Sequence, residues 1–443
     1  MSNCRKIAFD ITNDIFIKNA YSNIALNNNL KNSTLEQKDR ALVTEIVYGT
    51  IKYKYTIDIV LEKFLRGGIK KTDKEIVNLL RNGVYQMMYL DKVPSFAVVN
   101  ESVEIAKKYI NSKAGSVVNG VLRNILRTDL NEINSDNSKD GELAFKYSFP
   151  KWLVKIICGQ YGNVKGEEIL NGLNERPSVT VRVNALKISY DDALEKLREN
   201  GYDVQKGIIA KDAIIIEKGS SIENNLMFNE GYITVQDESA MLTAPLMDLK
   251  EGNLAIDMCS APGGKSTHMA EIMKNKGEII SCDVYDNKLK IINENAKRLG
   301  AEIIKTEIRN GEVLYDELIN YADAVLADVP CSGLGIIRKK PEIKWNKTKK
   351  DLQDLIKIQR NILQNASKYV KKGGNLVYST CTINKGENEE NIRWFLEKNS
   401  EFEIEPIELG SVDNIIKHKE GFVTILPNKY MDGFFICKLR RKS

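Results

Sequence analysis

Apolar residues recur about every fourth position through the first 130 residues, with polar residues between them. In residues 5–16, for example, Ile7, Ile11 and Ile15 fall on one face of a helix. The alternation of apolar and polar residues that marks a β-strand is almost absent. The pattern predicts an all-α bundle of about six or seven helices, large enough to fold alone. Helices are expected at 5–16, 41–47, 56–64, 76–88, 98–109 and 117–126.

Residues 131–236 have a mixed pattern. The stretch 131–141 is polar and rich in turn-forming residues, which predicts a linker. A short helix is expected after Pro150, and the alternating residues 179–184 predict a strand. These features indicate a small α+β module that need not fold independently. Its other expected elements are a helix at 190–199 and strands at 202–204, 213–217 and 232–236.

Residues 237–443 alternate between short apolar stretches and amphipathic ones. Such alternation indicates a parallel, doubly wound, Rossmann-like α/β sheet. A final antiparallel pair is expected at 422–426 and 433–439, and this arrangement is typical of class I methyltransferases that use S-adenosyl-L-methionine. The chain is therefore predicted to be multidomain, with parts at 1–130, 131–236 and 237–443. Strands are expected at 254–258, 278–283, 302–306, 324–328 and 375–379, and helices at 266–274, 287–298, 349–370 and 387–398.

Composition adds few constraints to this picture. The 443 residues are 42% hydrophobic, enough for real cores, and the net charge of +5 permits a nucleic-acid partner without requiring one. Basic residues of the helical part are either solvated or a subset of them meets RNA phosphates. These are Arg40, Lys52, Lys54, Arg81, Arg123 and Arg127.

The numbers of cysteines and histidines limit the cellular compartments and the kinds of site that fit the sequence. Seven cysteines without CxxC spacing favour reduced, cytosolic thiols, and two histidines argue against zinc sites and Ser–His–Asp schemes. The start of the chain has no apolar core of signal-peptide length, and no long apolar run follows. We expect a soluble cytoplasmic protein without metal or membrane association, and a monomer by default.

The stretch IDMCSAPGGKSTHMAE, residues 256–271, joins an apolar strand to a glycine loop and a helix start, where α/β proteins bind nucleotide-like ligands. A phosphate-binding Walker A loop would need glycine at Cys259, and G-x-G-x-x-G is absent. Asp283 ends the next strand, where a carboxylate can bind ribose hydroxyls. A ligand with ribose and without phosphates, S-adenosyl-L-methionine, fits this pattern. The alternatives are a turn residue for Asp283 and a solvated lysine for Lys265.

Two cysteines follow neighbouring predicted strands. Cys331 comes after Asp328-Val329-Pro330, and Cys381 lies in Ser-Thr-Cys-Thr. Ligands bind at the carboxyl ends of such strands, although a lone cysteine is usually a small buried apolar residue. A thiolate that adds to C6 of a pyrimidine makes C5 nucleophilic enough to accept a methyl group. An acid near N3 would stabilise that adduct, and Asp328 is placed for this role.

Three motifs resemble those of RNA 5-methylcytosine methyltransferases of the Sun/Fmu type, the RsmB/NOP family. They are CSAPGGKS at 259–266, DVPCSGLGIIRKKPEIKW at 328–345 and YSTCTINKGENEEN at 378–391. The stretches 39–53, 80–107 and 117–127 resemble the NusB-like, RNA-binding domain fused to the family members that act on 16S ribosomal RNA, and residues 182–187 and 235–242 match their intervening segments.

The resemblance implies a role for each candidate residue. Cys381 is the nucleophile that attacks C6, Cys331 helps to release the product, and Asp328 lies against the cofactor and the base. Asp283 holds the ribose, and Glu307 contacts the adenine where the family usually has Asp. The methionine part of the cofactor is wrapped by Cys259, Ser260, Ala261, Pro262, Gly263, Gly264 and Lys265. The basic side chains of one run would contact RNA phosphates, or be exposed to solvent alone. They are Arg338, Lys339, Lys340 and Lys344.

The implied activity is methyl transfer from S-adenosyl-L-methionine to C5 of a cytosine in 16S ribosomal RNA. Because the cytosine must leave its stack, unassembled or partly assembled RNA is the expected substrate. The helical part would dock the RNA or a protein partner. The alternatives are another RNA such as tRNA, a P-loop-like nucleotide hydrolase, and a non-catalytic RNA-binding or antitermination factor. Cys259 argues against the hydrolase and the cysteine pair against the non-catalytic factor.

Overall fold

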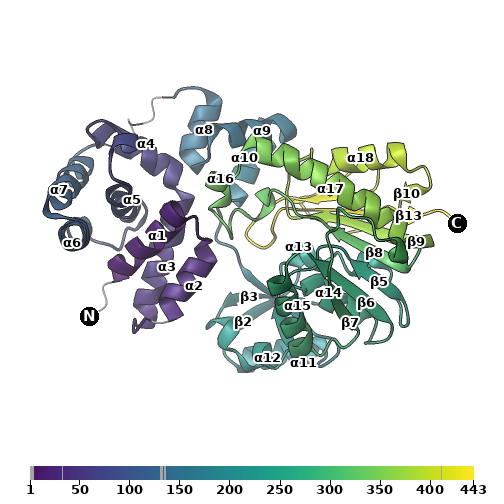
Figure 1. Ribbon diagram of the computed structural model, residues 1–443. Coiled ribbons are helices and arrows are strands. Elements are labelled where there is room, and N and C mark those ends of the chain that lie inside the picture. The colour runs from purple at the N-terminus through teal and green to yellow at the C-terminus, as the bar shows by residue number, and fades with distance from the viewer. Residues whose placement is uncertain (1–3, 32, 130–132, 134–135, 411) are drawn as a thin grey trace. The chain divides into compact units, whose positions relative to one another are not determined.

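The computed structural model describes residues 4–31, 33–129, 133, 136–410 and 412–443, which divide into two compact units (Figure 1). The first unit comprises residues 1–170 together with 340–346, and the second comprises 171–339 and 347–443. Domain boundaries at 130 and 236 remain a proposal beside this coarser division. Part of the predicted 131–141 linker lies outside the described residues, and helix α8 already begins at Lys139.

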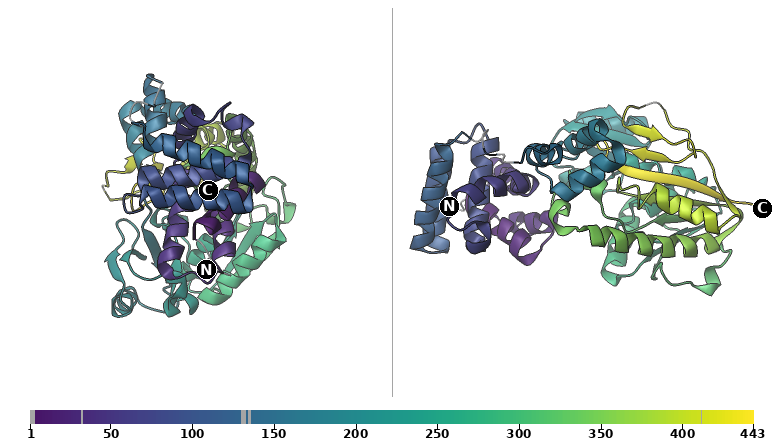
Figure 2. Two further views of the ribbon diagram at one scale, coloured as in Figure 1. Left: turned by 90° about the vertical axis from the view of Figure 1, so that its left-hand side faces the viewer. Right: turned by 90° about the horizontal axis from the view of Figure 1, so that it is seen from above.

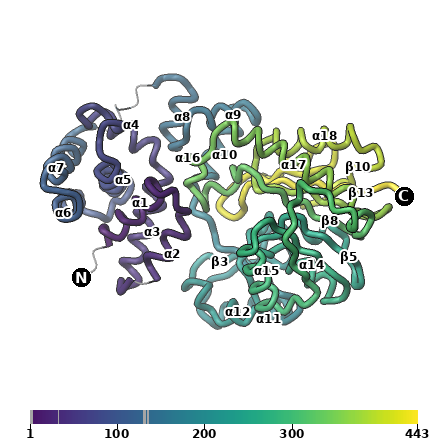
Figure 3. The backbone as a smooth tube through the Cα atoms, in the orientation of Figure 1, coloured from purple at the N-terminus to yellow at the C-terminus, as the bar shows by residue number. Residues whose placement is uncertain are grey.

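The first unit is all-α, as predicted, and Figure 3 shows its helical course in purple and blue. Helix α2 was not predicted, because its sequence SNIALNNNLK carries few apolar residues among its asparagines. Helices α1 and α3 to α7 lie where the spacing of apolar residues placed them, and α9 follows Pro150 as expected, whereas α8 and α10 were not predicted. The helices are α1 Cys4–Lys18, α2 Ser22–Lys31, α3 Gln37–Lys52, α4 Lys54–Phe64, α5 Lys74–Tyr89, α6 Ser95–Tyr109, α7 Ser112–Leu126, α8 Lys139–Tyr147, α9 Lys151–Tyr161 and α10 Asn163–Gly172.

Helix α5 lies at the centre of the bundle and contributes Leu79, Leu80 and Val84 to its core. Arg81 of the same helix is buried, and its Nε and Nη2 atoms donate to the two carboxylate oxygens of Asp58 at 2.7 and 2.9 Å. Such a bidentate pair occupies the guanidinium group. Arg81 is therefore a structural residue, and neither a solvated cation nor a phosphate contact.

A distant segment, residues 340–346, completes the core of the first unit. Within helix α16, Ile343–Asn346, the Trp345 indole N–H donates to the carbonyl of Ile51 at 2.8 Å. The ammonium group of buried Lys344 donates to the carbonyls of Lys52 and Ser148, each at 3.1 Å. Glu342 accepts hydrogen bonds from the backbone N–H and hydroxyl of Ser22 at 3.2 and 2.8 Å.

The expectation that the run Arg338, Lys339, Lys340 and Lys344 meets RNA or solvent is therefore wrong for most of its members. Lys344 is buried, and the side chain of Arg338 is 0% exposed in ion pairs with Asp237 and Asp432. Lys339 joins the same two carboxylates at 2.6 and 2.7 Å. Only Lys340 is exposed. Buried acidic partners, distant in sequence, turn this run into structural ion pairs.

The strands of the predicted α+β module and its helix at 190–199 belong to the second unit and lie close to their predicted positions, whereas the predicted helix after Pro150 is α9 of the first unit. The four strands of the module form an antiparallel sheet in the order β2-β3-β1-β4. One face packs on helix α11, through Val181, Val183, Ile214, Ile216 and Leu197. The elements are β1 Val179–Val183, α11 Tyr190–Glu199, β2 Asp203–Lys206, β3 Ala213–Lys218, α12 Leu226–Asn229 and β4 Ile233–Val235.

The large sheet of the second unit has the strand order β11-β12-β13-β9-β8-β5-β6-β7, with β10 paired to β13. Strands β5 to β9 are parallel, and β12 and β13 form the predicted antiparallel pair. Figure 2 shows β13 in yellow, running to the C-terminus. The strands are β5 Leu254–Asp257, β6 Glu278–Asp283, β7 Ile304–Ile308, β8 Ala322–Asp328, β9 Val370–Thr380, β10 Phe402–Ile404, β11 Ile415–Lys417, β12 Val423–Ile425 and β13 Phe434–Arg441.

Helices cover both faces of this sheet (Figure 1), which confirms the doubly wound α/β fold. One core gathers Ile362 and Leu363 of α17 with Phe395 of α18, and the other gathers Met269 of α14 with Ala296 of α15. In sheets of this kind, ligands bind at the carboxyl ends of the parallel strands. The helices are α13 Glu238–Met241, α14 Gly264–Ile272, α15 Asp286–Leu299, α17 Lys349–Tyr369 and α18 Glu389–Lys398.

Candidate active site

The two predicted cysteines meet at the carboxyl ends of β8 and β9. These strands are parallel neighbours, and Asp328 pairs in register with Ser379. The loops that follow bring the sulfur of Cys331 to 3.2 Å from the sulfur of Cys381. Both thiols are free and partly exposed. The fold thus places two thiols, distant in sequence, close enough for one ligand to touch both.

The glycine loop between β5 and α14 is held by its neighbours. The backbone N–H and the hydroxyl of Ser260 both donate to the carbonyl of Cys282 at 2.9 Å, which ties the loop to β6. The carbonyl of Pro262 accepts from Asn295 of α15 at 3.0 Å. Gly263 has φ +97°, and a Cβ there would lie 3.2 Å from Ile292, so only glycine suits this position. These contacts fix the shape of the loop.

Arg182 of β1 supports the same loop from the α+β module. Its side chain is 0% exposed and donates to the Gly264 carbonyl at 2.7 Å and to Thr267 at 3.1 Å. Its Nη2 atom lies 2.7 Å from the carboxylate of Glu271 in α14, and Nη1 also donates to Gln236. The α+β module thereby fixes the first turns of α14. This role was not predicted from the sequence.

Lys265 is not a solvated first-turn lysine. Its ammonium group donates to the Asp328 carboxylate at 2.6 Å, and the Ser379 hydroxyl donates to the other Asp328 oxygen at 2.7 Å. Burial alone would lower the pKa of Lys265, but the charge and the hydrogen bond of Asp328 and the charge of Asp257 together act against burial, and that pKa lies above its ordinary value. The charge of Cys381 acts in the same direction. A protonated lysine therefore stands beside Cys381.

Asp257, the last residue of β5, was not among the predicted site residues. Its side chain is buried, Ser266 donates to its Oδ2 atom at 2.6 Å, and its Oδ1 atom has no partner among the described residues. Burial, and then the charge of Asp328, raise the pKa of Asp257 to about 7. An acidic residue directly before the glycine loop is the sequence signal that could have identified it.

Asp283 and Glu307 lie on the neighbouring strands β6 and β7. Asp283 is 6% exposed, accepts from the Tyr285 N–H at 3.4 Å, and pairs with Lys288 at 3.2 Å. Strand β7 begins two residues later than predicted, so Glu307 lies inside it, opposite Cys282. Its carboxylate accepts from Arg309 at 2.5 Å. Asp283 thus keeps the predicted strand-end position, and Glu307 is engaged by an arginine.

The charges around the glycine loop suit a cationic ligand. The carboxylates of Asp257, Asp328 and Asp283 all act on Cys259, whose pKa is raised by burial first and by these charges next. Lys265 pairs with one of the three carboxylates. A phosphate would be repelled here, whereas a sulfonium with an ammonium group and a ribose finds carboxylates for each. The unpartnered Oδ1 atom of Asp257 supplies one such acceptor.

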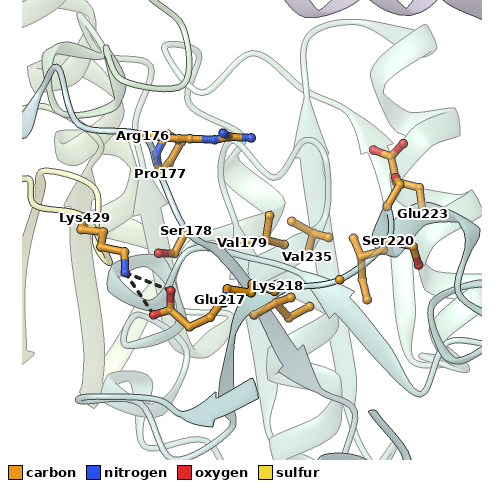
Figure 4. Close-up of a pocket in the computed structure, with 14 residues that line it drawn as sticks. Arg176, Pro177, Ser178, Val179, Glu217, Lys218, Ser220, Glu223, Val235 and Lys429 are labelled. Carbon is orange, nitrogen blue, oxygen red and sulfur yellow. Dashed lines mark hydrogen bonds and ion pairs between the residues drawn. The ribbon is translucent and has the colours of Figure 1, made fainter. Parts of the chain in front are cut away.

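The α+β module also carries a cavity of about 630 Å³ that none of the candidate site residues lines. Val179 and Val235 contribute apolar walls, and Figure 4 shows Lys429 paired with Glu217 at its rim, at 2.9 Å. The residues that carry chemistry lie instead at the strand ends. Among the described residues, no cluster of His, Cys, Asp and Glu is arranged to hold a metal ion, and no helix is long and apolar enough to cross a membrane.

Three protein-family models match successive parts of the chain. Residues 2–127 match the NusB family, and residues 149–223 match the RsmF/B-like ferredoxin-like domain. Residues 244–440 match a model described as 16S rRNA methyltransferase RsmB/F. The matched segments follow the order of the bundle, the α+β module and the large sheet.

Curated relatives and solved structures agree with these models. The chain is 39% identical to the probable ribosomal RNA small subunit methyltransferase B of Bacillus subtilis (strain 168), over 99% of both chains. It is 31% identical to ribosomal RNA small subunit methyltransferase B of Shewanella oneidensis, over 100% of both. The crystal structure of PH0851 has TM-score 0.86 and 27% identity, covering 100% of this chain and 99% of that one. NSun6 from Pyrococcus horikoshii with SFG has TM-score 0.60 and 25% identity, covering 67% and 99%.

Proposed function

Because the chain belongs to the 16S rRNA methyltransferase RsmB/F family, we propose that it methylates C5 of a cytosine in 16S ribosomal RNA. The observation that carries this proposal is the pair of thiols 3.2 Å apart beside an acidic glycine loop. Methyl transfer to oxygen or nitrogen needs no thiol, whereas C5 of a pyrimidine becomes nucleophilic only after a nucleophile has added to C6. Two thiols at the reacting edge therefore favour carbon methylation.

S-adenosyl-L-methionine, when bound, supplies the methyl group. The residues that would hold it are the loop 259–265 and the carboxylates of Asp257 and Asp283, with Glu307 near the adenine. Asp257 would bind the positively charged part of the methionine, and Asp283 would accept hydrogen bonds from the ribose hydroxyls. A carboxylate can accept hydrogen bonds from either kind of group. Arg182 keeps the loop in shape through the Gly264 carbonyl.

Cys381 would act as the nucleophile. Its thiolate adds to C6, the ring electrons move toward N3, and the Lys265–Asp328 pair gives N3 a proton. The pair recovers this proton when the ring becomes aromatic again. Lys265 and Asp328 share a hydrogen bond of 2.6 Å and Lys265 interacts with the charge of Cys381, so acid and nucleophile lie together.

Cys331 would release the product. As the bond between Cys381 and C6 breaks, the Cys331 thiol gives its proton to the departing sulfur and takes the C5 proton in its place. Cys381 then loses its proton to solvent, which restores the starting thiolate. The hydrogen bond to Cys381, burial, and the charges of Cys381 and Glu387 raise the pKa of Cys331. A proton therefore stays on Cys331, while Cys381 lies beside the ammonium group of Lys265.

Loss of one methylcytosine from 16S ribosomal RNA is the expected result of deleting the gene. Bisulfite sequencing reads this directly, because 5-methylcytosine resists deamination. Wild-type protein should restore the mark in extracted 16S RNA, and more slowly in assembled 30S subunits, where the base is less free to leave its stack. An unchanged 16S pattern with a lost mark in tRNA would move the substrate to tRNA and contradict the proposal.

Cofactor affinity should rise with pH through about 7. Asp257 has its pKa raised to about 7, and a bound cation favours its ionised form. Below that value the carboxylate must lose a proton to bind, so the dissociation constant for S-adenosyl-L-methionine should be about tenfold higher at pH 6 than at pH 8. Titration calorimetry measures this. Asp257→Asn should bind weakly with no such slope, and a flat wild-type profile would contradict the assignment.

A further inference from the structure

Glu387 lies in the loop between β9 and α18, and its side chain is completely buried. The Ser332 hydroxyl and the Asn384 amide donate to its Oε1 atom at 2.5 and 3.0 Å. The Ser332 N–H and the Gln359 amide donate to its Oε2 atom, both at 2.8 Å. Each of these groups is a donor, which is what an ionised carboxylate accepts. Glu387 is therefore a satisfied buried anion.

The carboxylate reaches both cysteine loops through hydroxyl groups. Ser332 follows Cys331, Thr382 follows Cys381, and their hydroxyl oxygens lie 2.8 Å apart. Because the Ser332 hydroxyl donates its proton to Glu387, Thr382 is the donor to Ser332. A single chain of hydrogen bonds thus runs from the loop of Cys381 to the loop of Cys331 and ends on the carboxylate. This chain joins the two loops whose sulfurs lie 3.2 Å apart.

The charged groups that lie nearest to the two thiols have opposite signs. The titratable groups that face Cys331 are Cys381, Glu387 and Tyr378, whose hydroxyl donates to the backbone carbonyl of Glu387 at 2.6 Å. Cys381 lies instead beside the ammonium group of Lys265. A negative charge favours a proton on the nearest thiol, and a positive charge favours a thiolate. Geometry and charge therefore assign the proton to Cys331.

We propose that Glu387 is the positioning residue for product release, which holds Cys331 beside Cys381 and keeps the proton on Cys331 until the bond to C6 breaks. The inference rests on the proposed function, in which Cys331 exchanges its proton for the C5 proton of the base. Glu387 touches neither the RNA nor the cofactor in this scheme. It acts through Ser332 and through its charge.

Glu387→Gln keeps the size of the side chain and removes its charge. We expect turnover to fall by about 10- to 100-fold, because proton transfer in the release step loses its donor geometry. A denaturation-resistant protein–RNA complex should accumulate, while the dissociation constant for S-adenosyl-L-methionine stays unchanged. The rate at which iodoacetamide alkylates Cys331 can be measured by mass spectrometry over a range of pH. The pH midpoint of this rate should be lower in Glu387→Gln than in the wild type. A purely structural role would not move that midpoint.

Glu389→Gln is the matched control. Glu389 begins α18, is 2% exposed, and contacts Thr424 rather than the cysteine loops. It should show wild-type turnover and no trapped complex. The inference would be overturned if the Glu387→Gln protein released its RNA at the wild-type rate, or if the pH midpoint for alkylation of Cys331 were the same in the variant and the wild type. If Glu387→Gln does not fold, Ser332→Ala must trap the complex, and its failure to do so has the same meaning.

The failure of this inference can be told apart from the failure of the proposed function. An active Cys381→Ala protein would refute the covalent mechanism itself. An inactive Cys381→Ala protein, together with a Glu387→Gln protein that releases its RNA normally, would refute only the role of Glu387.

Discussion

A Cys331→Ala protein is expected to stay bound to its RNA after denaturation. Cys381 can still add to C6 and C5 can still be methylated, but no thiol 3.2 Å away protonates the departing sulfur or takes the C5 proton. Multiple turnover should fall by at least about 100-fold, the scale of a lost proton-transfer group. A denaturing gel with labelled 16S RNA and S-adenosyl-L-methionine measures the trapped fraction, which should approach one RNA per protein.

Cys381→Ala gives the opposite expectation, with neither trapped RNA nor methylation. The double variant Cys331→Ala/Cys381→Ala should also form no complex, which proves that the trap is the bond to Cys381. Cys158→Ala, in α9 of the helical unit, is the control for loss of a thiol and should behave as wild type. Methylation by Cys381→Ala at the wild-type rate would sink the covalent mechanism.

Arg182→Met is expected to destabilise the second unit by about 3–5 kcal/mol, because the buried carboxylate of Glu271 loses its partner. The Gly264 carbonyl loses a donor at the same time, so affinity for S-adenosyl-L-methionine should also fall. Hydrogen exchange of the α14 amides at increasing urea, read by mass spectrometry, reports this unit separately from the helical one. That separation matters because a protein with two units need not unfold in one step.

The double variant Arg182→Met/Glu271→Met tests the cause. It removes both buried charges, so it should recover most of the lost stability, while cofactor affinity stays reduced. Arg441→Met removes an arginine of β13 that donates to Asn320 and to the carbonyl of Val370, away from the glycine loop. It should leave cofactor affinity unchanged. Equal loss of affinity in Arg441→Met would show that the effect is not specific to the loop.

Hydrophobic periodicity was enough to place most of the fold. The fourfold spacing of Ile7, Ile11 and Ile15 predicts α1, and the alternation in 179–184 predicts β1, because local period decides which face is buried. The predicted bounds of strand β7 were two residues too early, because its sequence IKTEI is only partly buried and shows little alternation of apolar and polar residues. Helix α2 has too few apolar residues to show a period.

The placement of the candidate residues was predictable where it depends on local motifs, and less so where it depends on tertiary partners. The motifs predicted that Cys331, Cys381, Asp283 and the glycine loop lie at the strand ends, because the carboxyl ends of parallel strands share one edge of the sheet. The buried pairs of Arg182 with Glu271, and of Arg338 with Asp237, join residues far apart in sequence. No spacing rule reports such pairs. A basic run such as 338–344 therefore resembles an RNA contact until its acidic partners are located.

The segment 340–346 has a consequence for how this protein can be recombined. The backbone passes between the two units at 170, 339 and 346, so the helical unit is encoded by two separate stretches of the gene. A fragment that stops at residue 170 omits Trp345 and Lys344, and leaves the carbonyls of Ile51, Lys52 and Ser148 without these donors. A chimera that exchanges the helical bundle for that of a relative must therefore exchange residues 340–346 with it.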